Sequence, residues 1–227
     1  MTPNDMSSIN ISGPEEFIEY FDISRETLEL LDIYANTLQH WQKTINLVAP
    51  STLDSVWQRH FADSAQLLKL APENVTSWVD LGSGAGFPGL VIAILIHGKR
   101  GAEAGSVVRL IESDARKAAF LGEIARRTSV AVDIVPRRIE LSSTQANFEP
   151  VEVVTARALA PLERLLGLAY RFFNDGTIGL FPKGRDVERE IEAARKDWQF
   201  DVRLEQSLTD PEGRIAVIEH LKAKSKG

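Results

Sequence analysis

The sequence of 227 residues predicts an α/β fold: a seven-stranded, mostly parallel sheet with helices on both faces, an antiparallel hairpin at its C-terminal end and an N-terminal helical extension. From Ser77 onward, fully apolar runs alternate with helical runs, which is typical of a parallel sheet covered on both sides. The last two apolar runs are separated only by TDPEG, a strong turn signal, so they form a hairpin.

The first 72 residues carry only helical patterns. Pro14 suits the first position of a short helix, and Ser24 suits the N-cap of a long one. Two shorter helices over 51–59 and 63–70 are expected before APEN breaks the pattern. We expect residues 1–72 to pack as an extension on a core of residues 73–227, as one compact unit. The long helix has one apolar stripe, formed by Leu28, Leu31, Tyr34, Leu38, Trp41 and Ile45.

The core pattern assigns strands and helices in alternation. The strand-like runs are 77–81, 107–112, 131–135, 151–156, 177–181, 200–208 and 214–221. The helical runs are 88–96, 114–128, 138–145, 161–173 and 185–197. HGKRGAEAGS, at 97–106, reads as a surface loop, and LKAKSKG as a frayed basic tail.

The composition of the chain indicates the cellular compartment in which the protein works. The chain is 44% apolar and 26% charged, as in ordinary globular proteins, and it contains no cysteine. Disulfides and thiolate metal sites are therefore excluded, and we expect no metal. The start MTPNDMSSIN lacks a signal-peptide pattern, and the longest aliphatic run, 90–96, is far shorter than a membrane span. We expect a cytoplasmic protein.

The net charge of −6 is unevenly distributed. Residues 1–32 contain eight acids and one base, so the remaining body is nearly balanced. A locally basic face is compatible with this pattern, and a globally basic surface is not.

The loop in WVDLGSGAGFPGL follows the first strand and precedes a helix, where an open α/β sheet binds its ligand. Its glycines are Gly82, Gly84 and Gly86, and Phe87 stands where a dinucleotide fingerprint has its third glycine. Asp80 before the loop opposes a pyrophosphate and suits a positively charged ligand. S-adenosyl-L-methionine, with its ammonium and sulfonium, has this charge.

The loop resembles the cofactor loop of Rossmann-like S-adenosylmethionine-dependent methyltransferases. Glu112 ends the second strand, where a carboxylate takes the two ribose hydroxyls, and the terminal hairpin also resembles that superfamily. The plainer alternative is that the glycines only form a tight turn.

Further stretches narrow the resemblance: HWQKTINLVAPS, RHFADS, DLGSGAGFPGLVIAI, ESDARKAAFL, ARALAPLERLL and LFPKG. In this order they resemble the ribosomal RNA small subunit methyltransferase G family, also called glucose-inhibited division protein B. The resemblance implies a bacterial enzyme that methylates N7 of a guanosine in the 530 loop of 16S ribosomal RNA, at position 527, within the small ribosomal subunit. The chain departs from the usual pattern of this family in two places, an unusually acidic N-terminus and a longer loop at 97–106.

The resemblance implies cofactor contacts at Gly82 and Phe87, at Ile139 and Glu140 after the third strand, and at Arg157 after the fourth. Together with the loop analysis, the expected cofactor residues are Asp80, Gly82, Gly84, Gly86, Phe87, Glu112, Ile139, Glu140 and Arg157.

Guanine N7 has a lone pair and no proton, so the reaction needs positioning rather than a general base. Arg or Lys recognises the O6 beside N7. Arg157 and Lys183 follow strands at the expected cleft, and we interpret both as catalytic residues that position the substrate. Expected RNA contacts are Arg138, Lys183, Arg126 and Arg127; a solvated surface role is the alternative for each.

His60 and Asp63 in RHFADS suggest acid–base work, but their spacing favours a structural role on a helix. Trp41 is expected to pack within its stripe. We expect a monomer. Three alternatives stay open: a small-molecule or protein methyltransferase, a non-catalytic binding module, and a nicotinamide oxidoreductase, which Phe87 and Asp80 oppose.

Overall fold

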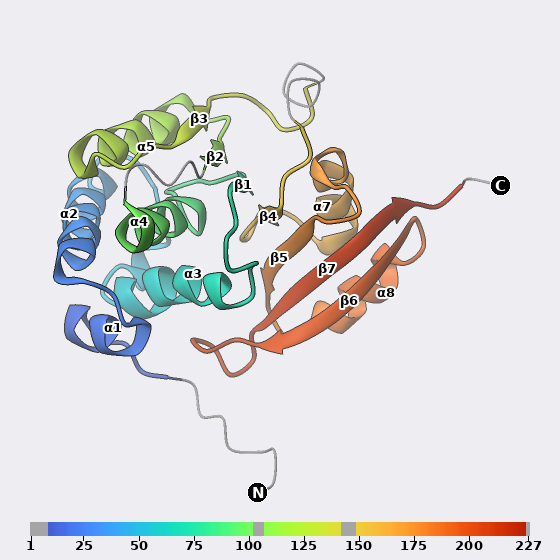
Figure 1. Cartoon of the computed structure of the whole chain (residues 1–227), viewed down its shortest axis with the longest axis horizontal. Helices are drawn as coiled ribbons and strands as arrows, with labels where there is room; N and C mark the ends of the chain where they lie inside the picture. The colour runs from blue at the N-terminus through green and yellow to red at the C-terminus, as the bar shows by residue number, and fades with distance from the viewer. Residues whose placement is uncertain (1–8, 102–106, 142–148, 226–227) are drawn as a thin grey trace, which may run out of the picture.

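The computed structural model describes residues 9–101, 107–141 and 149–225. A seven-stranded sheet with the strand order β3-β2-β1-β4-β5-β7-β6 forms its centre (Figure 1). The first five strands are parallel, and β7 is antiparallel to both β5 and β6. This confirms the predicted fold class. The strands are β1 (Ser77–Leu81), β2 (Val107–Ile111), β3 (Asp133–Val135), β4 (Val153–Thr155), β5 (Ile178–Lys183), β6 (Trp198–Gln206) and β7 (Arg214–Ala223).

Helices cover both faces of the sheet, because successive side chains of each strand point to opposite sides. On β1, Trp78 packs into one buried apolar cluster and Val79 into another. The first cluster lies under α1 (Pro14–Phe21), α2 (Arg25–Gln42), α4 (Gly89–Arg100) and α5 (Ala115–Thr128). The second lies under α7 (Leu162–Ala169) and α8 (Val187–Ala194). Figure 1 shows the two groups of helices on either side of the strands.

The N-terminal helices contribute wholly buried side chains to the first cluster, including Phe17, Tyr34 and Phe61. Ser24 caps α2 as predicted, its hydroxyl accepting from the Thr27 N–H at 3.2 Å. Trp41 packs against the same cluster, with its ring 5.6 Å from that of Phe120, which agrees with the expected packing role. These helices therefore form part of the wall behind the carboxyl edge of the sheet.

Three expectations about helices need correction. The segments expected as separate helices over 51–59 and 63–70 include one unbroken helical run, because no glycine or proline interrupts residues 57–69. It comprises η2 (Trp57–Ala62), α3 (Asp63–Ala65) and η3 (Gln66–Lys69), after the turn η1 (Pro50–Thr52). Helix α4 extends to Arg100, so the first residues of the expected 97–106 loop are helical.

The third correction concerns the helix expected over 138–145. Its described part, up to residue 141, is a turn, and residues 142–148 lie outside the described residues. Within the described ranges, no helix combines the length and apolarity needed to cross a membrane.

Candidate functional site

Two adjoining clefts open at the carboxyl edge of the parallel strands. The larger cleft, of about 850 Å³, lies between the glycine loop, η2, the loop after β4 and the end of β5. The smaller cleft, of about 360 Å³, lies between the glycine loop, the end of β2 and the turn after β3. Gly82, Gly84 and Arg157 line both clefts, so the two form one continuous site.

The glycine loop uses left-handed backbone at Gly82, Gly84 and Gly86, with φ of 65°, 57° and 96°. A Cβ added at Gly84 would have only the Gly82 carbonyl oxygen near it, at 3.8 Å, so this position faces open space. A Cβ at Gly86 would lie 2.6 Å from the Tyr34 hydroxyl oxygen. Gly86 lines neither cleft, which corrects its expected cofactor contact: it lets the loop pack on α2.

Tyr34 from α2 supports the loop from behind. Its hydroxyl donates to the Ala85 carbonyl oxygen, and its ring stacks on Phe87 at a centroid distance of 5.2 Å. Complete burial raises the pKa of Tyr34 well above its usual value, so the hydroxyl stays a donor. The sequence shows Tyr34 only as a member of an apolar stripe, which carries no signal for this role.

Asp80 is not on the cleft wall, contrary to expectation. Its carboxylate is fully buried, where Oδ1 accepts from the Thr155 hydroxyl at 2.8 Å and Oδ2 accepts from the Gly89 N–H at 3.2 Å. Burial raises its pKa to about 6, against which these hydrogen bonds act. Asp80 therefore fixes the start of α4 to the sheet, because its position in β1 directs it under that helix.

Glu112 joins the glycine loop to the end of β2. Its Oε2 accepts from the Gly84 N–H at 2.8 Å, and its Oε1 accepts from the Asp114 N–H at 2.7 Å. A carboxylate has about four acceptor positions, so capacity remains for hydroxyl donors. Glu112 lines the smaller cleft together with the buried Ile139 and the exposed Glu140, three positions at which the sequence analysis expects cofactor contacts.

The smaller cleft fits the adenosine part of S-adenosylmethionine. It offers open backbone at Gly84, a carboxylate for ribose hydroxyls at Glu112 and an apolar side chain for a purine at Ile139. Phe87 lines the larger cleft instead, where its ring lies beside the guanidinium of Arg157.

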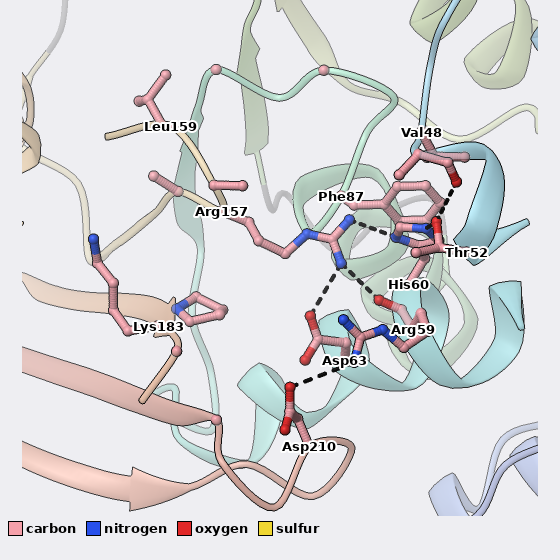
Figure 2. A pocket seen from close by; sticks show the side chains of 18 of the residues that line it. Val48, Thr52, Arg59, His60, Asp63, Phe87, Arg157, Leu159, Lys183 and Asp210 are labelled. Atoms are coloured by element: carbon pink, nitrogen blue, oxygen red, sulfur yellow. Dashed lines mark hydrogen bonds and ion pairs between the residues drawn. The ribbon is translucent and has the colours of Figure 1, made fainter. Parts of the chain in front are cut away.

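Arg157, at the end of β4, lies at the centre of the site. Its Nη1 donates to Asp63 Oδ2 at 3.1 Å and to the Arg59 carbonyl oxygen at 2.9 Å. Its Nη2 donates to His60 Nδ1 at 2.8 Å, and its guanidinium carbon lies 5.2 Å from the centre of the Phe87 ring. Figure 2 shows the guanidinium held by Arg59 and His60 of η2 and by Asp63 at the start of α3, which fixes its place in the cleft.

These contacts define the protonation of His60. Because a guanidinium only donates, Nδ1 of His60 accepts, and Nε2 carries the proton that faces Thr52 Oγ1 at 2.8 Å. Burial first, and then the nearby charge of Arg157, lowers the pKa of His60 to about 3. The ring is therefore neutral and holds Arg157, in agreement with the structural role that the sequence favoured for His60 and Asp63.

A pH dependence of stability follows. A histidine pKa of about 3 in the fold, against 6.5 unfolded, means that the unfolded chain binds the extra proton. Its contribution to stability is present above pH 6.5 and is lost as the pH falls toward 3. Urea unfolding should show a further loss of about 2 kcal/mol between pH 6.5 and 4.5 that His60→Gln lacks. The exposed His40 supplies the control, and an identical pH slope in His60→Gln and His40→Gln contradicts the assignment.

Lys183 ends β5 on another side of the larger cleft from His60 (Figure 2). Its side chain is only 8% exposed, and Nζ donates to Glu190 Oε2 at 2.7 Å and to the Ala160 carbonyl oxygen at 2.9 Å. The structure thus brings Arg157 and Lys183 to one cleft, as the sequence predicted.

The remaining expected RNA residues separate. Arg138 lines the smaller cleft. Arg126 pairs with Glu123 at 2.9 Å, and Arg127 donates to the Thr37 hydroxyl oxygen at 2.8 Å; neither lines a cleft. Both sit at the C-terminal end of α5, and a helix of 14 residues is about 20 Å long, which places them away from the cleft edge. Arg126 and Arg127 therefore lie outside both clefts, and their expected contact with RNA stays a prediction.

The clefts concentrate positive charge on a chain that is acidic overall. Five carboxylates line them, against eight cationic side chains: Arg59, Lys117, Arg137, Arg138, Arg157, Arg164, Lys183 and Arg214. The charge distribution of the sequence was compatible with such a local basic face. Sequence reasoning missed Lys117, which lines both clefts from the first turn of α5, although its place in ESDARKAAFL just after Glu112 was a usable signal.

Among the residues with described positions, no group of three or more His, Asp or Glu side chains is arranged to hold a metal ion.

Comparison with solved structures supports the fold. An O-methyltransferase from Bacillus cereus, in complex with SAH, superposes with a TM-score of 0.55 at 12% identity, over 90% of this chain and 96% of that one. A TehB-like SAM-dependent methyltransferase from Corynebacterium glutamicum gives a TM-score of 0.55 at 14% identity, over 83% and 98%. The fold is therefore that of Rossmann-like S-adenosylmethionine-dependent methyltransferases.

Sequence comparison is more specific. The protein named ribosomal RNA small subunit methyltransferase G of Rhodospirillum centenum is 49% identical over 214 residues, covering 92% of this chain and 94% of its own. The protein of the same name from Methylobacterium nodulans is 50% identical over 202 residues, covering 89% and 92%. The family model for rRNA small subunit methyltransferase G matches residues 27–216. The chain therefore belongs to the rRNA small subunit methyltransferase G family.

Proposed function

We propose that the protein transfers a methyl group from S-adenosylmethionine to N7 of the guanosine at position 527, in the 530 loop of 16S ribosomal RNA. The observation that carries this proposal is the continuity of the two clefts. The smaller one suits the cofactor, and the larger one presents Arg157 and Lys183 directly beside it. The substrate is the RNA of the small ribosomal subunit, and the enzyme acts in the cytoplasm as a monomer.

Two observations support ribosomal RNA over a small metabolite. The relatives named ribosomal RNA small subunit methyltransferase G match this chain over almost their whole length. The clefts also gather cationic side chains on a chain with a net charge of −6, which suits a local phosphate contact rather than a broad basic surface.

The bound cofactor supplies a methyl group on a positively charged sulfonium, which a nucleophile attacks in line with the departing sulfur. The residues of this chain hold that group in place. Glu112 receives the ribose hydroxyls, Ile139 packs on the purine, and the open backbone at Gly84 admits the ligand. Tyr34 keeps the loop rigid from behind, which lowers the cost of ordering it on binding.

No general base is required, because guanine N7 carries a lone pair and no proton. The arrangement of His60 supports this, because its Nδ1 lone pair already accepts from Arg157 Nη2. Catalysis then consists of holding N7 near the methyl group and in line with it. Lys183 and Arg157 donate to O6 or to flanking phosphates, since a donor aimed at N7 would block the attack.

The target base must leave any helical stack. A-form RNA presents its N7 edge in a groove too deep and narrow for side chains, so a loop nucleotide or an extruded base is the substrate. The larger cleft, of about 850 Å³, has the volume for such a base.

We expect Lys183→Ala to keep cofactor affinity within a few-fold and to lower methyl transfer roughly a hundredfold. Lys183 lines only the larger cleft, and loss of one charged hydrogen bond costs about 2–3 kcal/mol. Calorimetry with the cofactor and transfer of labelled methyl to small subunits measure the two effects. Lys99→Ala, an exposed lysine at the end of α4, is the matched control. Unchanged turnover in Lys183→Ala would show that Lys183 does not contact the substrate.

The proposal as a whole is tested by offering the enzyme labelled cofactor with isolated small subunits and, separately, with a panel of metabolites and proteins. Incorporation into the ribosomal RNA alone is expected. Incorporation only into a metabolite or a protein would contradict the proposal and show that the enzyme is a small-molecule or protein methyltransferase.

A further inference from the structure

The pair formed by Lys183 and Glu190 has unused hydrogen-bonding capacity facing the larger cleft. Lys183 Nζ uses two of its three hydrogens, on Glu190 Oε2 and on the Ala160 carbonyl oxygen. Glu190 Oε2 also accepts from the Leu162 N–H at 2.7 Å. Within the part of the chain that the structure describes, Glu190 Oε1 and the third ammonium hydrogen have no partner. Both residues line the larger cleft.

We propose that this pair recognises the Watson–Crick edge of the target guanine through hydrogen bonds, an inference that rests on the proposed function. Lys183 donates to O6, and Glu190 Oε1 accepts from N1–H and from the N2 amino group. Nζ is bonded to Oε2 at 2.7 Å, which holds the ammonium beside the carboxylate that carries the free Oε1, so a donor and an acceptor are neighbours, as O6 and N1–H are on guanine. Adenine carries the reverse pattern, with an amino donor at position 6 and a bare acceptor at N1.

The order of elements along the sheet edge supports this orientation. The glycine loop follows β1, Arg157 follows β4, Lys183 ends β5, and Glu190 lies in the next helix, α8. Strands β1, β4 and β5 are neighbours in that order. Around guanine the atoms run N7, O6, N1 and N2. N7 therefore points to the glycine loop when O6 meets Lys183 and the N1–N2 edge meets Glu190.

The other carboxylates of the larger cleft are already engaged. Asp63 Oδ1 accepts from the Thr209 hydroxyl at 2.8 Å and from Gln66 at 2.9 Å, while its Oδ2 faces Arg157. Asp210 Oδ1 accepts from a backbone N–H, and its Oδ2 pairs with Arg59 at 3.5 Å on the exposed rim. Of the three carboxylates that line the larger cleft in the described part of the chain, Glu190 is the one with an oxygen that accepts no hydrogen bond.

The same pair also fixes the loop after β4, through Ala160, and the start of α7, through Leu162. A role confined to positioning this loop would lower the rate equally for every base placed at the target. Reading the base changes the ratio between bases. The ratio is therefore the measurement that separates the two roles.

The first experiment uses the wild-type enzyme and small subunits reconstituted with guanosine, inosine or adenosine at the target position. Inosine lacks the N2 amino group, so kcat/KM for transfer to its N7 should fall about tenfold, as expected for one lost hydrogen bond to a charged acceptor. Adenosine should fall by about 10⁴ or more, because it leaves the polar groups of the site unpaired. Equal transfer to guanosine and inosine overturns the proposal.

The second experiment repeats these substrates with Glu190→Gln, and with Glu188→Gln as a matched control on the same helix that lines neither cleft. Transfer to guanosine should fall in Glu190→Gln, and the guanosine-to-inosine ratio should approach one. Glu188→Gln should keep the wild-type ratio. A slower Glu190→Gln enzyme with an unchanged ratio shows that Glu190 is only a positioning residue and overturns the proposal.

The two levels of inference fail differently. Absence of any transfer from the wild-type enzyme to unmodified small subunits overturns the proposed function and this inference together. Transfer to guanosine without discrimination between bases overturns the inference alone.

Discussion

Replacement of Gly84 by valine should abolish S-adenosylmethionine binding while the protein still folds. Gly84 lines both clefts, and a Cβ there would point into open space, with its only close neighbour 3.8 Å away. The branched side chain would thus occupy ligand volume instead of colliding with the protein. The left-handed backbone, with φ of 57°, adds a strain of about 1–2 kcal/mol, which a stable domain tolerates. Calorimetry should show no heat of binding.

Gly101→Val controls for this strain. Gly101 also has a positive φ, of 76°, and open space around its missing Cβ, but it lies beyond α4 and lines neither cleft. With a ψ of 175°, its backbone lies in a region essentially restricted to glycine, so it should lose at least as much stability and still bind the cofactor like the wild type. Normal binding by Gly84→Val would show that the glycine loop is not the cofactor site.

Arg157→Ala should damage binding, catalysis and stability together. The substitution removes the hydrogen-bond donor to His60 and the ion-pair partner of Asp63. The side chains of Arg157 and Asp63 are only 18% and 17% exposed. Leaving that carboxylate without its partner costs about 3 kcal/mol. Arg157 lines both clefts, so cofactor affinity should fall about tenfold and methyl transfer at least about a hundredfold.

Urea unfolding, calorimetry and transfer assays on the same preparations separate these effects. Arg203→Ala, which breaks an exposed pair with Glu205 in the hairpin, is the control and should change stability by less than about 1 kcal/mol. An Arg157→Ala enzyme with wild-type turnover would remove Arg157 from the catalytic residues, whatever its stability.

The sequence was sufficient for the features that depend on local pattern. Alternating apolar runs located the strands, and TDPEG located the hairpin turn. Because the carboxyl ends of parallel strands share one edge, the sequence alone places Glu112, Arg157 and Lys183 at one site, and all three line the two clefts.

Features that depend on side-chain direction or on distant segments could not be predicted. Asp80 lies one residue from the strand end, yet its side chain points under α4 rather than into the cleft. Tyr34 reaches the glycine loop from 51 residues away in the chain. Arg126 and Arg127 share a helix with Lys117, but about ten residues of helix carry them to its other end.

The measurement that tests the central claim most directly is the position of the new methyl group on the ribosomal RNA. Small subunits lacking the modification are incubated with enzyme and cofactor, and the RNA is then reduced and cleaved with aniline, a treatment specific for the fixed positive charge of N7-methylguanosine. We expect primer extension to show one new stop, at the guanosine at position 527 in the 530 loop. A methyl group on N1 or N2 of guanine, or on a cytosine, would contradict the account, because the proposed reaction uses the N7 lone pair and removes no proton from the base.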